Sequence, residues 1–207
     1  KIVMAFDRKA WRINYTLSEQ CISGKKYKGN RRKDMTEKER AKYEKFLEHL
    51  GQFEELMKTH TSVICLAADG LEADDLVAGF VQKYASLENE IVAVSTDKDY
   101  IQILGHVNTK LIDPASGKER TLEEWGGSAE LFMFEKCIRG DAGDNVQSAY
   151  PRVRKTRIMK AWADPLERVN MMEETWTNQT GKTMLVKEVF KENELLMDLA
   201  KQPQEWR

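Results

Sequence analysis

Four separated segments of the sequence carry carboxylates in short groups. They are Asp7, the run of Glu72, Asp74 and Asp75, the pair Asp97 and Asp99, and the pair Asp141 and Asp144. Carboxylates gathered in one place repel one another unless cations bind between them. Hard oxygen ligands select Mg²⁺, for which Mn²⁺ can substitute, rather than Zn²⁺. Two such ions about 4 Å apart would activate a water and stabilise a leaving oxygen in phosphodiester hydrolysis.

The elements that must position these groups alternate between strands and helices. Apolar runs at 2–6, 62–67, 91–95 and 107–112 predict buried strands, 71–85 and an apolar stripe after Thr36 predict helices, and 113–117 predicts a turn. This alternation predicts an α/β fold with a mainly parallel sheet flanked by helices. Ligands of open α/β sheets bind at the carboxyl ends of strands. The first three acidic groups are therefore expected to converge.

The chain has a different character after Ser128. Its pattern there is helical, including the spacing of leucines in 182–199, and a turn rich in glycine and aspartate interrupts it at 140–145. We therefore predict an α/β domain over residues 1–135 and a helical region over residues 136–207.

Two basic segments flank the acidic groups. Residues 25–42 contain nine Lys or Arg against three acids, and residues 152–163 contain five Lys or Arg and no acid. Candidates for phosphate contacts are Lys25, Lys26, Lys28, Arg31, Arg32, Lys33, Arg152, Arg154, Lys155 and Arg157. Tyr27 would stack on a base. Binding through such contacts weakens as the salt concentration rises.

Each feature also has a purely structural explanation. Asp69 is expected to cap the helix that follows, with Glu72 three residues on as in a capping box, and acids in a first helical turn favour the helix dipole. Glu72 remains a candidate ligand, because capping leaves Asp74 and Asp75 unexplained. Runs of charge are usually solvated surface. The five tryptophans are expected to pack rather than to stack on bases; they are Trp11, Trp125, Trp162, Trp176 and Trp206.

The composition restricts the class of protein. Of 207 residues, 41% are apolar and 32% are charged, so the chain can build a core and disorder is not indicated. The net charge of −1 decides nothing about a polyanionic partner. Three distant cysteines predict neither a disulfide framework nor a zinc site. No long apolar run is present, so we expect a cytoplasmic protein that does not use a membrane.

Taken together, these motifs resemble the 5′-nuclease family, which includes phage 5′-exonucleases, flap endonucleases and the 5′-nuclease domains of bacterial DNA polymerases. Segment 70–76 (GLEADDL) looks like the family's Glu-Ala-Asp-Asp metal motif, and 95–102 (STDKDYIQ) looks like its second acidic motif. Segment 139–145 (RGDAGDN) resembles its Gly-Asp-x-x-Asp-Asn turn, and 27–31 (YKGNR) is similar to the Tyr-Lys-x-x-Arg of its helical arch. The resemblance covers about residues 1–160.

The resemblance implies a role for each motif. Two Mg²⁺ ions would be held directly or through water by Asp7, Glu72, Asp74, Asp75, Asp97, Asp99, Asp141 and Asp144. Lys28 and Arg31 would contact the scissile phosphate, Asp97 would be essential for catalysis, and Arg12 would help to bind nucleic acid. The arch, at about 20–50, would grip a single-stranded 5′ end in the 1–135 nuclease domain. Residues 136–165, in the DNA-binding region, would form a helix-turn-helix-like clamp on duplex backbone.

The implied substrate is DNA with a 5′ flap or overhang, with RNA primers in RNA–DNA hybrids as a further substrate. The implied setting is DNA replication, beside proteins such as a single-strand-binding protein, and a monomer is expected. A PIN-type ribonuclease is an alternative, although such proteins usually lack the basic arch and the clamp. A non-catalytic nucleic-acid-binding module is a second alternative, although it would not need so many carboxylates.

The sequence departs from the family pattern in two places. The family has an earlier strand with another metal-binding Asp, which would lie ahead of Lys1. The glycine-rich hairpin that usually follows the Asp-Asn turn is replaced by 146–157 (VQSAYPRVRKTR). Glycines there let backbone amides approach phosphate, so Arg and Lys side chains would do more of that work here.

Overall fold

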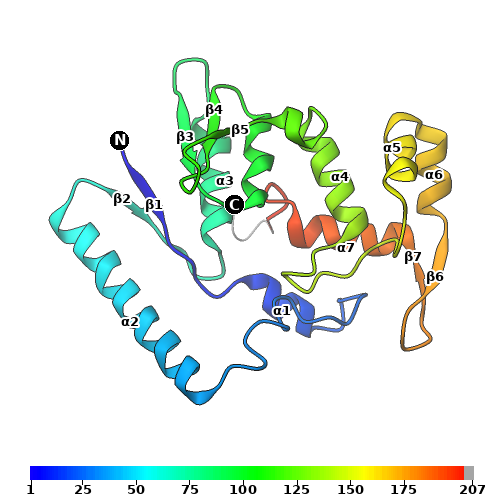
Figure 1. Ribbon diagram of the computed structural model, residues 1–207, viewed down its shortest axis with the longest axis horizontal. Coiled ribbons are helices and arrows are strands. Elements are labelled where there is room, and N and C mark those ends of the chain that lie inside the picture. Colours follow the sequence, from blue (N-terminus) through cyan, green and yellow to red (C-terminus); the bar gives the residue numbers. More distant parts are fainter. Residues whose placement is uncertain (203–207) are drawn as a thin grey trace.

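The structure, a computed structural model, describes residues 1–202, so Trp206 lies outside the described residues (Figure 1). Its first half contains β1 (Val3–Ala5), α1 (Trp11–Leu17), α2 (Glu37–His60), β2 (Ile64–Leu66), α3 (Ala73–Tyr84), β3 (Ile91–Val94), the 3₁₀ helix η1 (Lys98–Gly105), β4 (Thr109–Ile112), β5 (Glu119–Arg120) and the 3₁₀ helix η2 (Leu122–Trp125). Its second half contains α4 (Ala129–Arg139), α5 (Lys155–Ala163), α6 (Pro165–Met172), β6 (Thr175–Thr177), β7 (Thr183–Leu185) and α7 (Val186–Met197).

All four strands expected from the apolar runs are present, each shorter than predicted. β1 pairs in parallel with β2, and β3 pairs in parallel with β4. β5 adds to β4 in the antiparallel direction, after a turn in which the Asp113 side chain accepts from the Ala115 amide at 2.8 Å. The expectation of one mainly parallel sheet is therefore met only in part. Over residues 1–202 no strand pairs with both β1 and β3, so the two parallel pairs belong to separate sheets.

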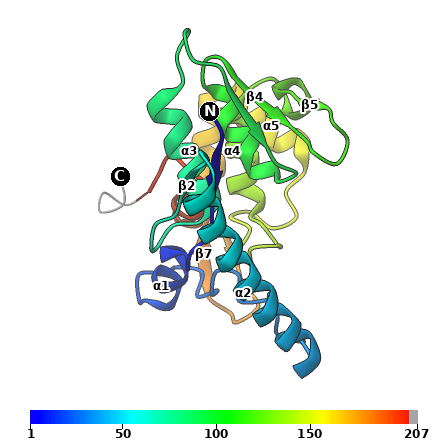
Figure 2. The same ribbon diagram turned by 90° about the vertical axis from the view of Figure 1, so that its left-hand side faces the viewer.

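Helix α2 begins just after Thr36, where the sequence predicts a helical pattern to start, and the structure shows a capping box there. The Glu39 amide donates to the Thr36 hydroxyl at 3.3 Å, and the Thr36 amide donates to the Glu39 carboxylate at 2.8 Å. The helix then extends away from the rest of the molecule (Figures 1 and 2). Its apolar stripe is largely exposed, with Phe46 57% and Leu56 53% accessible. The amphipathic pattern therefore predicted the helix correctly, but most of its apolar face is not buried.

Helix α3 begins at Ala73, with Glu72 as its N-cap residue. The expectation that Asp69 caps this helix is therefore wrong, because the helix starts four residues after Asp69. Instead, the Glu72 amide donates to the carboxylate of Asp75, three residues on, at 3.1 Å. The first turn of α3 thus carries the acidic motif itself.

The C-terminal half is mainly helical, as expected, but it also contains a hairpin that the sequence analysis missed. β6 and β7 pair with Trp176 opposite Met184, and Gly181 in the connecting turn has φ +82°. The β-favouring sequence Thr-Trp-Thr and the glycine turn were the signals for it. The Trp176 indole donates to the Ala149 carbonyl at 2.8 Å, which ties the hairpin to the loop before α5.

The main core lies between α4, α5, α7 and this hairpin. Its buried side chains include Phe134, Ile138, Ile158, Val186 and Val189. The predicted boundary between residues 135 and 136 falls inside α4. The α/β part and the C-terminal region therefore share one continuous helix. Among the described residues, no helix is long and apolar enough to cross a membrane.

Candidate metal and nucleic-acid site

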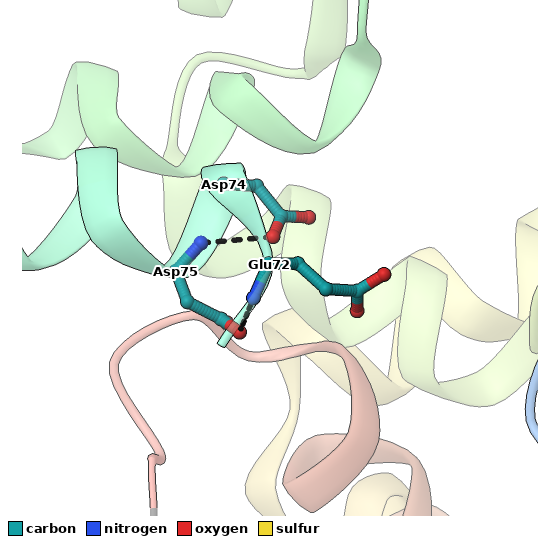
Figure 3. A group of neighbouring side chains, drawn as sticks. All are labelled: Glu72, Asp74 and Asp75. Carbon is teal, nitrogen blue, oxygen red and sulfur yellow. Dashed lines mark hydrogen bonds between the residues drawn. The ribbon is translucent and has the colours of Figure 1, made fainter. Parts of the chain in front are cut away.

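Three of the predicted metal ligands form a tight group at the start of α3 (Figure 3). One carboxylate oxygen each from Glu72, Asp74 and Asp75 lies within 4.8 Å of the others. The positive end of the helix dipole favours negative charge there. Within the group, the Asp75 amide donates to the Asp74 carboxylate at 2.8 Å. The donor set is oxygen only, which suits a hard divalent cation.

Asp75 is held by Arg12 from helix α1. Both terminal guanidinium nitrogens of Arg12 lie 2.7 Å from the two Asp75 oxygens, and Arg12 is only 1% exposed. The expectation that Arg12 binds nucleic acid is therefore wrong for this structure, because its guanidinium is buried and paired. It acts as an internal counter-ion that fixes one acidic side chain.

Among residues 1–202, Asp74 has no such partner. Burial, and then repulsion by Asp75 and Glu72, raise the pKa of Asp74 to about 7, although Arg12 and Lys28 act in the opposite direction. A carboxyl with this pKa carries an unfavourable charge above neutral pH. A divalent cation bound beside it would remove that penalty.

The basic segment that follows α1 closes over the acidic group. The Lys28 ammonium contacts Glu72 and lies 4.0 Å from Asp144, and Arg31 forms an ion pair with Asp144. The Lys28 backbone amide also donates to the Asp144 carbonyl at 2.7 Å, with Lys28 in the left-handed region at φ +54°. The structure therefore places both predicted phosphate-binding cations at the edge of the carboxylates.

Tyr27 lies beneath these cations and does not reach the surface. It is 4% exposed, and its hydroxyl donates to Asp144 at 2.9 Å and to Glu72 at 3.1 Å. The expectation that Tyr27 stacks on a base is wrong for this structure, because the ring is part of the core. Tyr27 instead links the α3 acidic motif to the turn at 140–145.

A second acidic group surrounds Lys136, on the last turn of α4. The Lys136 ammonium contacts Asp99 and lies 3.4 Å from Asp141. Asp97 is exposed and caps η1, since its side chain accepts from the Asp99 amide at 2.9 Å. The sequence analysis missed Lys136. Its position five residues before Asp141 was the signal that could have found it.

Asp7 lies at the edge between the two acidic groups. It is exposed, and its carboxylate accepts from the Ala73 amide of α3 at 2.8 Å. Burial, followed by the charges of Asp74, Asp97 and Asp7, raises the pKa of Tyr100. These three carboxylates therefore act on one phenol. The expected convergence is partial, because Asp7, Asp97 and Asp99 lie outside the tight group.

The remaining basic candidates lie on the surface in two places. Lys25, Lys26, Arg32 and Lys33 are exposed in the irregular segment before α2, within the expected arch. Arg152, Arg154 and Arg157 line a hollow of about 570 Å³ at the start of α5, and Lys155 is exposed beside it. Arg157 is already paired with Glu174 and donates to the Tyr150 hydroxyl at 2.6 Å.

A comparison with known protein families identifies the family to which the chain belongs. Residues 1–130 match the model of the 5′-3′ exonuclease N-terminal resolvase-like domain, which is more than half of the chain. The chain belongs to this family. The acidic motif at the start of α3 and the basic segment at 25–33 both lie within the matched range of this exonuclease domain.

Individual relatives agree with the family match. The chain is 28% identical over 190 residues to ribonuclease H of Enterobacteria phage T4, covering 80% of this chain and 61% of that protein. It is 30% identical over 128 residues to the flap endonuclease of Escherichia phage T5, covering 58% of this chain and 43% of that one. The chain thus spans less than two thirds of these curated relatives. The solved structure of T5 5′-exonuclease with bound zinc superposes with a TM-score of 0.68 at 25% identity, covering 95% of this chain and 73% of that chain.

Proposed function

We propose that this exonuclease-family chain carries the nuclease centre of a structure-selective 5′-nuclease. It would hydrolyse phosphodiesters near 5′ ends or flaps of DNA. The observation that carries the proposal is the juxtaposition at α3, where three carboxylates lie within 4.8 Å of one another and Lys28 contacts one of them, Glu72. Lys28 also lies 4.0 Å from Asp144, which pairs with Arg31. An acidic group alone would repel DNA. Carboxylates edged by cations suit a site that holds a metal ion and a phosphate together.

The residues present fit divalent cations, with Mg²⁺ as the expected ion and Mn²⁺ as its substitute. Burial and the neighbouring carboxylates raise the pKa of Asp74, which is consistent with a position where a bound cation would stabilise the charged form. We propose that Glu72, Asp74 and Asp75 hold one ion and that Asp97, Asp99, Asp141 and Asp144 contribute to a second, with Asp7 at the edge. Two bound ions would supply activation of the attacking water and stabilisation of the leaving oxygen.

The protein's own cations have separate tasks. Lys28 and Arg31, at the edge of the carboxylates, would bind the substrate phosphate and neutralise the negative charge that develops on it. Arg12 keeps Asp75 in one orientation through two hydrogen bonds of 2.7 Å. The exposed basic residues before α2 and at the start of α5 would hold the nucleic-acid backbone on either side of the site.

The names of the relatives support two substrate classes. The T5 relative is a flap endonuclease, which supports DNA with a 5′ flap or overhang. The T4 relative is a ribonuclease H, which supports the RNA strand of an RNA–DNA hybrid as a further substrate. We also propose a role in DNA replication beside a single-strand-binding protein, with the protein acting as a monomer.

Cleavage of a 5′-flap DNA tests the proposed function. We expect the protein to cleave this DNA with Mg²⁺ and not with EDTA. Asp97→Asn should abolish cleavage and leave DNA binding largely intact, because it removes one ligand charge from an exposed position. Asp69→Asn, an exposed acid next to the motif, is the matched control and should cleave normally. If Asp97→Asn cleaved at the wild-type rate, the acidic site would not be the centre that catalyses cleavage.

A further inference from the structure

Lys136 is the one lysine that α4 directs into the acidic site. Its ammonium contacts Asp99 from η1 and lies 3.4 Å from Asp141 in the turn after α4. The Lys136 side chain is only 11% exposed, against 18% for Asp99 and 30% for Asp141. An internal cation is therefore enclosed between two carboxylates that the sequence motifs assign to metal binding.

The pairing keeps Lys136 charged in spite of its burial. Two carboxylates face the one ammonium, and their attraction offsets the cost of removing it from water. A buried ammonium is stable only when carboxylates surround it in this way. The Asp99–Asp141 half of the site therefore already contains one full positive charge.

The other half of the site differs in its charge. Arg12 pairs with Asp75 and lies 3.5 Å from Glu72, which Lys28 also contacts. Within residues 1–202, Asp74 forms no ion pair and accepts a hydrogen bond from the Asp75 amide. Its carboxylate belongs to the tight group of three oxygens. The two halves are thus unequal before any ion binds, because Lys136 faces both Asp99 and Asp141 in one half, whereas Asp74 in the other half forms no ion pair among the described residues.

We propose that Lys136 is the resident cation of the Asp99–Asp141 half and sets its affinity for a divalent ion. This rests on the proposed function, in which both halves bind metal. One ion binds first at Glu72, Asp74 and Asp75. A second ion binds between Asp99 and Asp141 only when the Lys136 ammonium leaves that position, since both cations need the same oxygens. Lys136 is thus a positioning residue that separates the two binding steps.

Calorimetric titration of the metal-free protein with Mn²⁺ tests this inference. Wild-type protein should show one tight site and one weaker site. Lys136→Met keeps a long side chain without the charge, so its weaker site should tighten about tenfold or more, as removal of a nearby positive charge requires. Lys136→Arg keeps the charge and should leave the second site weak. Arg139→Gln, on the same helix and paired with Glu135 outside the site, should titrate like wild type.

Thermal unfolding with and without Mn²⁺ supplies a second readout. Without metal, Lys136→Met should unfold at a lower temperature than wild type, because Asp99 and Asp141 then face each other unpaired. Saturating Mn²⁺ should raise its melting temperature by more than it raises that of wild type. A Lys136→Met protein that folds only with Mn²⁺ would also support the inference.

The unfavourable outcomes separate the two proposals. Lys136→Met could show the same second-site affinity and the same metal-induced shift in melting temperature as wild type. That result would overturn the role of Lys136 but not the proposed function. If Lys136→Met does not fold under either condition, tight binding of both ions by Lys136→Arg would overturn it. Wild-type protein that binds no Mn²⁺ at all would overturn the proposed function itself.

Discussion

The carboxylates of the site differ in whether a cation lies beside them. Asp75 is bound by Arg12, Glu72 by Lys28, Asp144 by Arg31 and Asp99 by Lys136. Asp74 is the member of the tight group without a cation of its own, and its pKa is raised to about 7. A carboxyl of this kind gains most from a bound divalent ion, since the ion restores its charged form.

At the scale of single residues, Lys28→Ala tests whether the Lys28 ammonium, which contacts Glu72 in the free protein, stabilises the substrate phosphate during cleavage. We expect single-turnover cleavage of flap DNA to slow by about a hundredfold or more, because one preorganised positive charge is lost from the developing anion. Affinity for the DNA should change much less, since other basic residues contact the backbone. Lys118→Ala, exposed in the turn between β4 and β5, is the control. An unchanged single-turnover rate would exclude Lys28 from catalysis.

Helix α2 is attached to the start of the chain through the carboxylate of Glu54. Arg8 donates to both oxygens of Glu54, at 2.7 and 2.8 Å, and Lys58 donates to the same carboxylate at 2.6 Å. The rings of Phe53 and Phe6 lie 6.4 Å apart beside this contact. Glu54 therefore joins the long exposed helix to the strand that leads to Asp7.

Glu54→Gln tests this attachment and its dependence on pH. Hydrogen bonds from Arg8 and then Lys58 lower the pKa of Glu54. A lowered pKa means that the carboxylate stabilises the fold above the unfolded pKa of about 4.3 and loses this effect as pH falls through the folded value. The variant should melt below wild type at pH 7, and the difference should shrink below about pH 4.

Thermal unfolding followed by circular dichroism between pH 3 and pH 8 measures this difference. Glu55→Gln, the exposed neighbour on the same helix, should melt like wild type throughout. A constant difference between Glu54→Gln and wild type at every pH would show that packing, not charge, accounts for the effect.

The whole molecule presents basic residues at two distant parts of its surface. One is the irregular segment before α2 and the other is the start of α5, with the acidic centre between them in sequence. Figure 1 shows α2 and α5 on opposite sides of the molecule. Under the proposed function, a nucleic acid would contact both surfaces on its path past the carboxylates, so that local basic charge would let a nearly neutral chain bind a polyanion.

Removing charge at α5 tests this path. Arg152→Gln combined with Arg154→Gln should weaken binding of duplex DNA and reduce the slope of log Kd against log salt by about two. Both side chains are exposed, so the fold should be unaffected. Lys83→Gln combined with Lys118→Gln removes the same charge elsewhere and should leave the slope unchanged. If both double variants gave the same slope of log Kd against log salt, the hollow at the start of α5 would not be part of the DNA-binding surface.

The sequence by itself determined the acidic motifs, the four first strands and the start of the α2 helix after Thr36. These features depend on residues that are close in the chain, where spacing and apolar periodicity act directly. The same local information predicted the wrong cap for α3 and missed β6 and β7, because short segments of this kind take their conformation from the contacts around them.

Only the tertiary structure decided which charges meet. Lys136 reaches Asp99 across 37 residues of sequence and Arg12 reaches Asp75 across 63. No local pattern marks these pairs, and the same basic residue types occur throughout the surface. Arg12 and Tyr27 are both predicted from the sequence to bind nucleic acid, yet packing places both in the interior. Burial removes them from the nucleic acid and makes them supports for the carboxylates, because a buried polar group is stable only with partners inside the protein.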